Sequence, residues 1–233
     1  MLPPKTPLGL GVALIDNGPD VTDEQLADWY EGEHIPRRLT VPGIMSAQRF
    51  KAIDSKTPKW LTLVDLEAPE IASSPAYLAL ASQGSDTEKL IFSKLGGTSV
   101  QIYAHTQTFV HPNTIPKNDL PTKYLLTVGF VPDSTEAGAE LDKWYEEEHM
   151  ELLAKVPGWK AGKRFLLTSQ KNRGSLADQP EAKYFAVHWF DNKDFAGTPE
   201  FQHASSTPWR LRILEHCTRE ARTWELTKDF GSA

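Results

Sequence analysis

The pattern of apolar and polar positions predicts a mixture of strands and helices. Residues 8–15 are apolar and rich in strand formers, and a turn follows them. Thr22 and Gln25 form a capping box that starts a helix, which is expected to end near residue 39. The remaining elements expected in this half are strands 45–53, 60–66 and 98–109 and helices 76–82 and 87–95. Their order is β-α-β-β-α-β, that of a ferredoxin-like unit.

One stretch of this pattern occurs twice, 115 residues apart and without a gap. Residues 26–50 are LADWYEGEHIPRRLTVPGIMSAQRF, and residues 141–165 are LDKWYEEEHMELLAKVPGWKAGKRF. A self-match of this quality indicates a tandem duplication. The elements expected around the second copy are strands 124–131, 164–168, 183–190 and 219–226, helix 136–155, and helix 199–217 with a break at Pro208. Residues 169–182 are expected to form a polar loop.

The repeat predicts two units in one chain. Residues 1–110 form the first ferredoxin-like repeat, the Pro-rich segment 111–122 is a linker, and residues 123–233 form the second repeat. Strand 183–190 is apolar on both faces, so both faces are expected to be covered. The predicted fold class is therefore α+β, with the two repeats forming an intramolecular dimeric-type α+β barrel.

Charge, cysteine content and hydropathy limit the kinds of partner and the compartment that we expect for this protein. The net charge is −6, and a basic patch of the kind that binds nucleic acid is missing from the sequence. A single cysteine, Cys217, allows no disulfide within the chain and suggests a reducing compartment. No stretch approaches the ~18 apolar residues of a spanning helix, and prolines interrupt the N-terminus where a signal peptide would be apolar. We expect a cytoplasmic protein without a membrane or nucleic-acid partner, and a homo-oligomer remains open.

The repeated helix carries polar residues along its apolar side. Helical spacing places Tyr30, Glu33 and His34 on one side, behind Leu26 and Trp29. A glutamate and a histidine that continue a buried stripe either enter a cleft or have partners inside the protein. The second copy has the same residues at Tyr145, Glu148 and His149, behind Leu141 and Trp144.

The motif WY-x-x-EH, followed by VPG and RF, resembles that of the dimeric α+β barrel superfamily, and most closely its EthD-like members. The resemblance covers both halves and implies that the tandem arrangement replaces the usual homodimer. It also implies small-molecule chemistry of several kinds. The superfamily includes monooxygenases without cofactors, cyclases, isomerases, decarboxylases, dehydratases, haem enzymes and members without known activity.

His34 is the first candidate for acid/base catalysis, because an imidazole transfers protons near neutral pH. Tyr30 and Glu33 are its candidate partners, and His149 is the candidate of the second copy. In the structural alternative, Glu and His hold the following Val-Pro-Gly loop by hydrogen bonds. Both interpretations stay open for His34, and the structural one is preferred for His149.

Other polar residues are candidates for substrate binding. Arg37 and Arg38 give the first copy a cationic helix end, suited to a carboxylate or phenolate, although arginines there also complement the helix dipole. Tyr103 and His105 share a strand face that would be a pocket wall if it lined the barrel, but an outward face is preferred. The further candidates are Arg49, Tyr145, Glu148 and Arg164; pairing of the two arginines with Glu33 and Glu148 is the alternative.

The leading functional expectation is an enzyme without metal, nucleotide or other cofactor. It would move protons on an aromatic or polyketide-like substrate as an isomerase, cyclase, dehydratase or decarboxylase. One alternative is a ligand-binding or stress-related barrel without turnover. A second alternative is a cofactor-independent or haem-dependent monooxygenase or oxidase. Sequence motifs for zinc, phosphate loops and serine hydrolases are missing from the chain.

Overall fold

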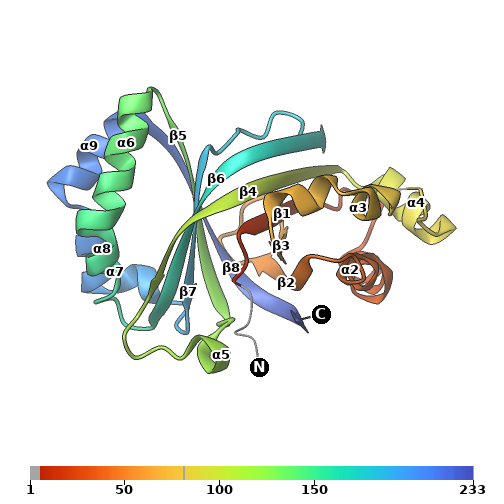
Figure 1. Cartoon of the computed structure of the whole chain (residues 1–233), viewed down its shortest axis with the longest axis horizontal. Helices are drawn as coiled ribbons and strands as arrows, with labels where there is room; N and C mark the ends of the chain where they lie inside the picture. Colours follow the sequence, from red (N-terminus) through yellow and green to blue (C-terminus); the bar gives the residue numbers. More distant parts are fainter. Residues whose placement is uncertain (1–5, 81, 233) are drawn as a thin grey trace. The chain divides into compact units, whose positions relative to one another are not determined.

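The computed structural model describes residues 6–80 and 82–232 (Figure 1). The chain belongs to the α+β class, and its hydrogen-bonded strands close into a barrel in the order β1-β3-β2-β8-β5-β7-β6-β4. The strands are β1 (Gly9–Asp16), β2 (Ile44–Ala52), β3 (Trp60–Leu66), β4 (Gly97–Val110), β5 (Tyr124–Pro132), β6 (Trp159–Gly174), β7 (Tyr184–Phe190) and β8 (Cys217–Ser232). The sequence-based expectation of an α+β barrel is therefore confirmed at this level.

Each α-helix of the described residues lies between two consecutive strands in the chain. The α-helices are α1 (Asp23–Trp29), α2 (Ile35–Leu39), α3 (Pro75–Ala79), α4 (Asp86–Lys94), α5 (Pro116–Asp119), α6 (Thr135–Trp144), α7 (Met150–Leu153), α8 (Pro199–Ala204) and α9 (Pro208–His216). The 3-10 turns are η2 (Pro69–Ser73) and η4 (Phe195–Gly197). The expected break at Pro208 is present, since this proline starts α9 behind the N-cap residue Thr207.

The chain forms two compact units, and the long strands contribute to both. Unit 1 consists of Met1–His105, Leu167–Gln179 and Thr227–Ala233, and unit 2 of Thr106–Leu166 and Pro180–Leu226. Each unit thus contains one complete copy of the repeated stretch. The boundaries expected from the sequence, 1–110, 111–122 and 123–233, stay a prediction; the short helix α5 lies within the expected linker.

In unit 1, strand β1 lies between β3 and β4, with Val12 opposite Leu63 on one side and Gln101 on the other. The register places Gly11, Ala13 and Ile15 on the same face. Ile15 packs in a buried cluster with Trp29 and Tyr30 of the motif helix, so this face lies toward the helices.

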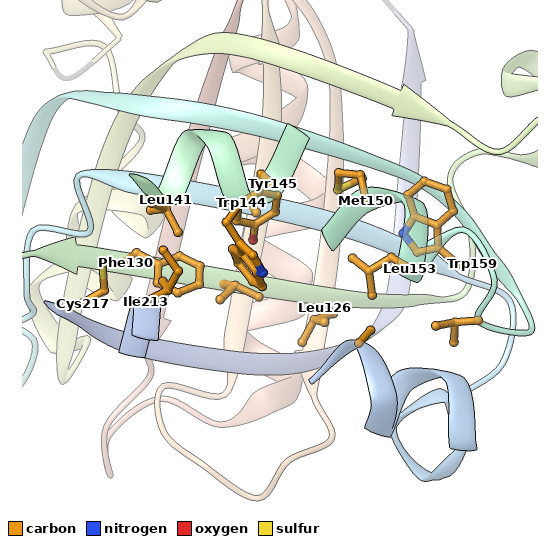
Figure 2. Packing of buried hydrophobic residues seen from close by; sticks show 14 of the residues in the cluster. Leu126, Phe130, Leu141, Trp144, Tyr145, Met150, Leu153, Trp159, Ile213 and Cys217 are labelled. Carbon is orange, nitrogen blue, oxygen red and sulfur yellow. The ribbon is translucent and has the colours of Figure 1, made fainter. Parts of the chain in front are cut away.

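Unit 2 has the same strand neighbours in the second half of the sequence. Strand β5 pairs with β7 and β8, and Leu126 lies opposite His188. Figure 2 shows how the helix-side cluster is filled, with Leu126 and Phe130 of β5 and Trp144 and Tyr145 of the second motif close together. Large side chains thus occupy the space between sheet and helices in this unit.

Both motif helices are interrupted by a π-helical turn, which the sequence did not indicate. The turns are η1 (Tyr30–His34) and η3 (Tyr145–His149). In the first, the backbone N–H of Ile35 donates to the carbonyl of Tyr30, five residues back. Such turns are rare and often lie at functional sites. Because both copies have one, the turn belongs to the shared helix architecture.

The hairpin β6–β7 differs from the expected structure. Strand β6 begins at Trp159, earlier than expected, and continues to Gly174, into the segment expected to be a loop. Polar side chains extend this ribbon: Gln170 and Asn172 both donate to the carbonyl of Gln179. Polarity alone suggested a loop, but here the polar side chains bind backbone groups across the hairpin.

Candidate functional site

Unit 1 contains a cavity of about 410 Å³ between its sheet and its helices. This volume lies in the range of small-molecule sites. Its lining is mainly apolar and comes from β1, β3, β4, the motif helix, α3, α4 and the outer part of β6. The polar side chains at its wall include Tyr30, His34, Arg38, Thr98 and Lys171.

Small residues on β1 leave this space open. Gly11 lies opposite Val64 on β3, and Ala13 is the next residue on the same face. A Cβ placed on Gly11 would lie 3.4 Å from the Cβ of Val64, an ordinary contact, so alanine would fit there. The absence of bulk at Gly11 and Ala13 therefore leaves room beside the motif helix.

The imidazole of His34 is held by a carboxylate from helix α4. Its Nδ1 lies 2.8 Å from Oε1 of Glu88. This contact favours the tautomer with the proton on Nδ1, which leaves Nε2 as the basic nitrogen. His34 lines the cavity, and no described residue binds its Nε2. The arrangement is that of an oriented general base.

Aromatic rings fix the position of the same imidazole. The rings of Trp29 and Tyr30 each have their centroid 4.6 Å from that of His34, and Tyr30 is stacked on it. Burial lowers the pKa of His34 to about 4, although the hydrogen bond to Glu88 acts in the opposite direction. The histidine is therefore neutral at pH 7 and available to accept a proton.

The two arginines of the first motif have different positions. Arg37 binds Glu88 and donates to the carbonyl of Leu80 at 3.1 Å, so it holds the helices together. Arg38 lines the cavity, and its Nη1 donates to the carbonyl of His34 at 3.2 Å. The cationic group expected near a substrate anion is thus Arg38 rather than Arg37.

The motif glutamates do not hold the Val-Pro-Gly loop. Oε2 of Glu33 accepts a hydrogen bond from the hydroxyl of Ser85, the N-cap residue of α4, at 2.8 Å. Likewise, Oε1 of Glu148 accepts one from Thr207, the N-cap residue of α9, at 2.6 Å. Each glutamate therefore anchors the start of the helix that faces the motif. Glu33 is not part of the cavity lining.

Tyr30 is part of the cavity wall through its buried ring. Burial raises the pKa of its hydroxyl, and a hydrogen bond to Thr62 acts in the opposite direction. Its hydroxyl is thus already engaged with the sheet.

The matching space in unit 2 is almost filled, with a volume of about 20 Å³. Strand register makes Leu126 the counterpart of Gly11, and His188 the counterpart of Val64. A Cβ on Gly162 would lie 2.8 Å from Nδ1 of His188, which shows how closely this region is packed.

Unit 2 also differs from unit 1 at the positions of two residues that line the unit 1 cavity, Ala13 and Arg38. Val128 occupies the position of Ala13, and Leu153 that of Arg38. Both are buried beside the second motif. Unit 2 thus lacks the room beside its motif histidine and has no counterpart of Arg38. The sequence left open which copy holds a site, and cavity size favours unit 1.

His149 has no carboxylate partner. The N-cap serine Ser85 accepts from the backbone N–H of Glu88, and Thr207 accepts in the same way from Arg210. By this correspondence, Arg210 stands where unit 1 has Glu88. His149 stacks on Trp144 at 4.0 Å and its Nδ1 is buried without a partner. Burial lowers its pKa well below the usual value.

Arg49 and Arg164 are buried structural cations, and the expected pairing with Glu33 and Glu148 is wrong. Nη1 of Arg49 binds Glu31 at 2.7 Å, and Nη2 of Arg164 binds Asp142 at 2.6 Å. The guanidinium of Arg164 also lies 4.1 Å from the ring centroid of Tyr145. The correct partners lie on the flank of the motif helix that faces β2 or β6.

Tyr103 lies on a buried face of β4, so the preferred outward orientation is wrong. Its hydroxyl donates to Gln101 at 2.9 Å, and Gln101 donates to Ser99. Neither Tyr103 nor the half-buried His105 is part of the cavity lining, which takes Thr98, Val100 and Ile102 from the opposite face of the strand.

Replacing Arg49 by alanine is expected to lower the free energy of unfolding by about 2–4 kcal/mol. Arg49 is only 1% exposed, and its guanidinium lies 4.1 Å from the ring centroid of Trp60. Lys51, an exposed cation on the same strand and ring, is the control, and Lys51→Ala should cost less than about 1 kcal/mol. Urea unfolding measures both; equal losses would contradict the structural role of Arg49.

The protein should lose stability as the pH falls from about 6.5 towards 4. Burial lowers the pKa of His34 to about 4 and that of His188 to about 3, so the folded state binds fewer protons there than the unfolded state. The lowered pKa of His34 alone corresponds to about 3 kcal/mol in the free energy of unfolding. Urea unfolding at several pH values measures this slope, the change in the free energy of unfolding per pH unit. His188→Leu should flatten it and the exposed His203→Ala should not; an unchanged slope in His188→Leu would contradict the prediction.

The described residues contain neither a candidate metal cluster nor a candidate membrane-spanning helix. No group of three or more His, Cys, Asp or Glu side chains there is arranged to hold a metal ion. Among the same residues, no helix is long and apolar enough to cross a membrane.

Sequence reasoning missed Glu88 and the small residues of β1. Glu88 lies 54 residues from His34 on a helix without a distinctive motif, so nothing in the sequence pairs them. Gly11 and Ala13 could have been found, because the offset of 115 residues also aligns them with Leu126 and Val128. Comparing the two copies beyond the motif would have indicated the open unit.

Comparison with solved structures supports the fold. An anthrone oxidase-like protein matches with a TM-score of 0.63 and 16% identity, over 97% of this chain and 93% of that one. A cyanide complex of a chlorite dismutase variant from Candidatus Nitrospira defluvii matches with a TM-score of 0.59 and 11% identity, over 95% of this chain and 92% of that one. A candidate monooxygenase from Lactobacillus acidophilus NCFM matches with a TM-score of 0.54 and 9% identity, over 98% of this chain and 99% of that one. No family model matches the sequence, and no curated protein does.

These neighbours correct the leading functional expectation. Their names describe an oxidase, a monooxygenase and a dismutase, and not an isomerase, cyclase, dehydratase or decarboxylase. The expectation of an isomerase or lyase is therefore contradicted, and the second alternative agrees better with them. At these identities the likeness concerns the fold alone: the chain has the fold of the dimeric α+β barrel proteins.

Proposed function

We propose that the protein is an oxidase or monooxygenase-type enzyme that uses O2 on a small, largely apolar aromatic molecule. The reaction takes place in the unit 1 cavity, with His34 as the base. The observation that carries this proposal is the pair of Glu88 and His34 beside a cavity of about 410 Å³. The names of the structural neighbours support an oxidative reaction over the other chemistries of this fold.

The first step is proton transfer. A substrate with an acidic C–H next to a carbonyl, or with a phenolic hydroxyl, gives its proton to Nε2 of His34. The Glu88 carboxylate at 2.8 Å from Nδ1 stabilises the imidazolium that results. The desolvated cavity strengthens this interaction.

The second step is attack by O2. The carbanion passes one electron to O2, the two radicals combine to form a C–O bond, and the imidazolium returns the proton to give a hydroperoxide. A hydroperoxide on a former CH2 carbon loses water and leaves a ketone. In sum, CH2 and O2 become C=O and H2O, without a further reductant.

Arg38 is the candidate for binding the substrate oxygen that carries the negative charge. It lines the cavity one helical turn after His34 and is the only motif arginine in this lining. Nη1 of Arg38 lies 4.0 Å from Oε1 of Glu88, so the two opposite charges balance each other before substrate binds. A developing enolate or phenolate would therefore lie between a cation and the apolar wall.

A haem fits this site poorly. The cavity volume lies near the low end for small-molecule sites, and the space next to the second motif is about 20 Å³. His34 is enclosed by Trp29 and Tyr30. Protein produced with a haem precursor is expected to show no Soret band. A Soret band that disappears in His34→Ala would contradict the reaction proposed here.

The direct test of the proposal is oxygen uptake with anthrone as the probe. Wild-type protein is expected to consume one O2 for each anthrone and to form the corresponding ketone. Chelator-treated protein serves as a control, and it should react at the same rate. If anthrone is consumed without O2, or O2 uptake does not exceed the rate in buffer, the proposal fails for this substrate class.

We also propose that the two units derive from one duplicated β-α-β-β-α-β unit. The matching registers of β1 with β3 and of β5 with β7, and the two π-helical turns, support this. The closer resemblance to EthD-like proteins remains a prediction.

A further inference from the structure

The small space in unit 2 has an unusual lining. Its volume of about 20 Å³ holds about one water-sized particle. The polar side chains around it are Tyr145, His149, His188, Ser205, Arg210 and Arg219, and no carboxylate is among the lining residues. A buried polar space of this kind needs an occupant with hydrogen-bonding capacity.

Two imidazoles at this space have unused nitrogens. The Nε1 hydrogen of Trp159 points to Nδ1 of His188 at 3.5 Å, which leaves the proton of the neutral ring on Nε2. That Nε2 is buried and has no partner, and His188 is 1% exposed. Nδ1 of His149 is also buried without a partner.

The cations at the space are the half-buried Arg210 and the exposed Arg219, and both lack an ion-pair partner among the described residues. No carboxylate of a described residue lies within ion-pair distance of Arg210 or Arg219. In unit 1, the position of Arg210 is held by Glu88, whose carboxylate oxygen binds Nδ1 of the motif histidine. Unit 2 therefore has the imidazole of this pair and an excess of positive charge, but lacks the negative partner.

We propose that the small space in unit 2 binds a single halide-sized anion, which takes the place of the missing carboxylate oxygen. His188 donates its Nε2 hydrogen, and Arg210 and Arg219 supply the charge. A proton taken up by His149 on Nδ1 completes the shell. Polyatomic anions such as sulfate are excluded by the volume. The site is structural and separate from the reaction in unit 1.

The first test compares melting temperatures in sodium chloride and sodium gluconate at equal ionic strength. Chloride is expected to raise Tm by about 3 °C or more for each tenfold increase above its Kd, and gluconate is not. In Arg219→Gln the chloride effect should be lost. Arg212→Gln changes an arginine that is exposed like Arg219 but lies outside the lining, and it should retain the effect. Equal behaviour of the two salts in wild type would overturn the proposal.

A reciprocal variant separates loss of the site from loss of folding. Arg210→Glu restores a carboxylate at the position of Glu88, so this variant should fold, should reach the Tm of chloride-saturated wild type and should no longer respond to chloride. Bromide-soaked crystals should show an anomalous peak beside His188 in wild type but not in Arg210→Glu. A peak that persists in this variant, or no peak in wild type, would overturn the assignment.

Discussion

Replacing His34 by alanine is expected to reduce the turnover of anthrone about 10²–10⁴-fold, the usual contribution of a positioned acid/base group. The variant loses the nitrogen that accepts the substrate proton, whereas the cavity becomes larger. Binding should therefore survive while kcat falls. Oxygen uptake measures turnover, and ligand-observed binding measures affinity.

Two variants serve as matched comparisons for His34→Ala. His149→Ala removes the equivalent histidine of unit 2 and should leave turnover within about twofold, because no cavity adjoins it that could hold the substrate. Glu88→Gln keeps a hydrogen-bond acceptor for Nδ1 but removes the charge, and should reduce kcat about 10–100-fold. If His149→Ala loses as much activity as His34→Ala at unchanged Tm, the assignment to unit 1 is wrong.

Replacing Gly11 by leucine is expected to abolish substrate binding. This change places in unit 1 the residue that fills the same position in unit 2, and leucine would project between β1 and the motif helix. Because the occupied volume is an existing cavity, the protein should fold with a Tm close to that of wild type. Ligand-observed binding and O2 uptake should both be lost, with a loss of at least about tenfold in affinity.

Gly11→Ala is the control for this variant. Its Cβ would lie 3.4 Å from that of Val64, so only ordinary contacts form and most of the cavity remains. Binding should fall by less than about fivefold. If Gly11→Leu still binds and turns over the substrate normally, the cavity of unit 1 is not the site.

The fold could be predicted largely from local patterns. The capping box at Thr22, the break at Pro208 and the order of strands and helices were visible in the sequence, because each depends on neighbouring residues. The π-helical turns were not visible, since a turn at Tyr30–His34 shifts the helix by one residue without changing its composition. The length of β6 depends on backbone pairing across the hairpin, which polarity does not reveal.

The candidate site was only half predictable. The histidine was found from its place on a buried helix stripe, and Arg38 from the difference between the two copies. The contact with Glu88 depends on how α4 meets the motif helix, which is a tertiary property. The motif glutamate was misread for the same reason: its partner Ser85 lies on another element, whereas the Val-Pro-Gly loop was close in sequence.

Anaerobic incubation of anthrone in D2O tests the central claim most directly, because it separates proton transfer from the reaction with O2. Without O2, wild type and His149→Ala are expected to exchange the methylene hydrogens of anthrone for deuterium faster than buffer does, whereas His34→Ala should bind anthrone without accelerating this exchange. If wild type does not accelerate the exchange, or if His34→Ala accelerates it equally well, His34 is not the base and the account of this site is wrong.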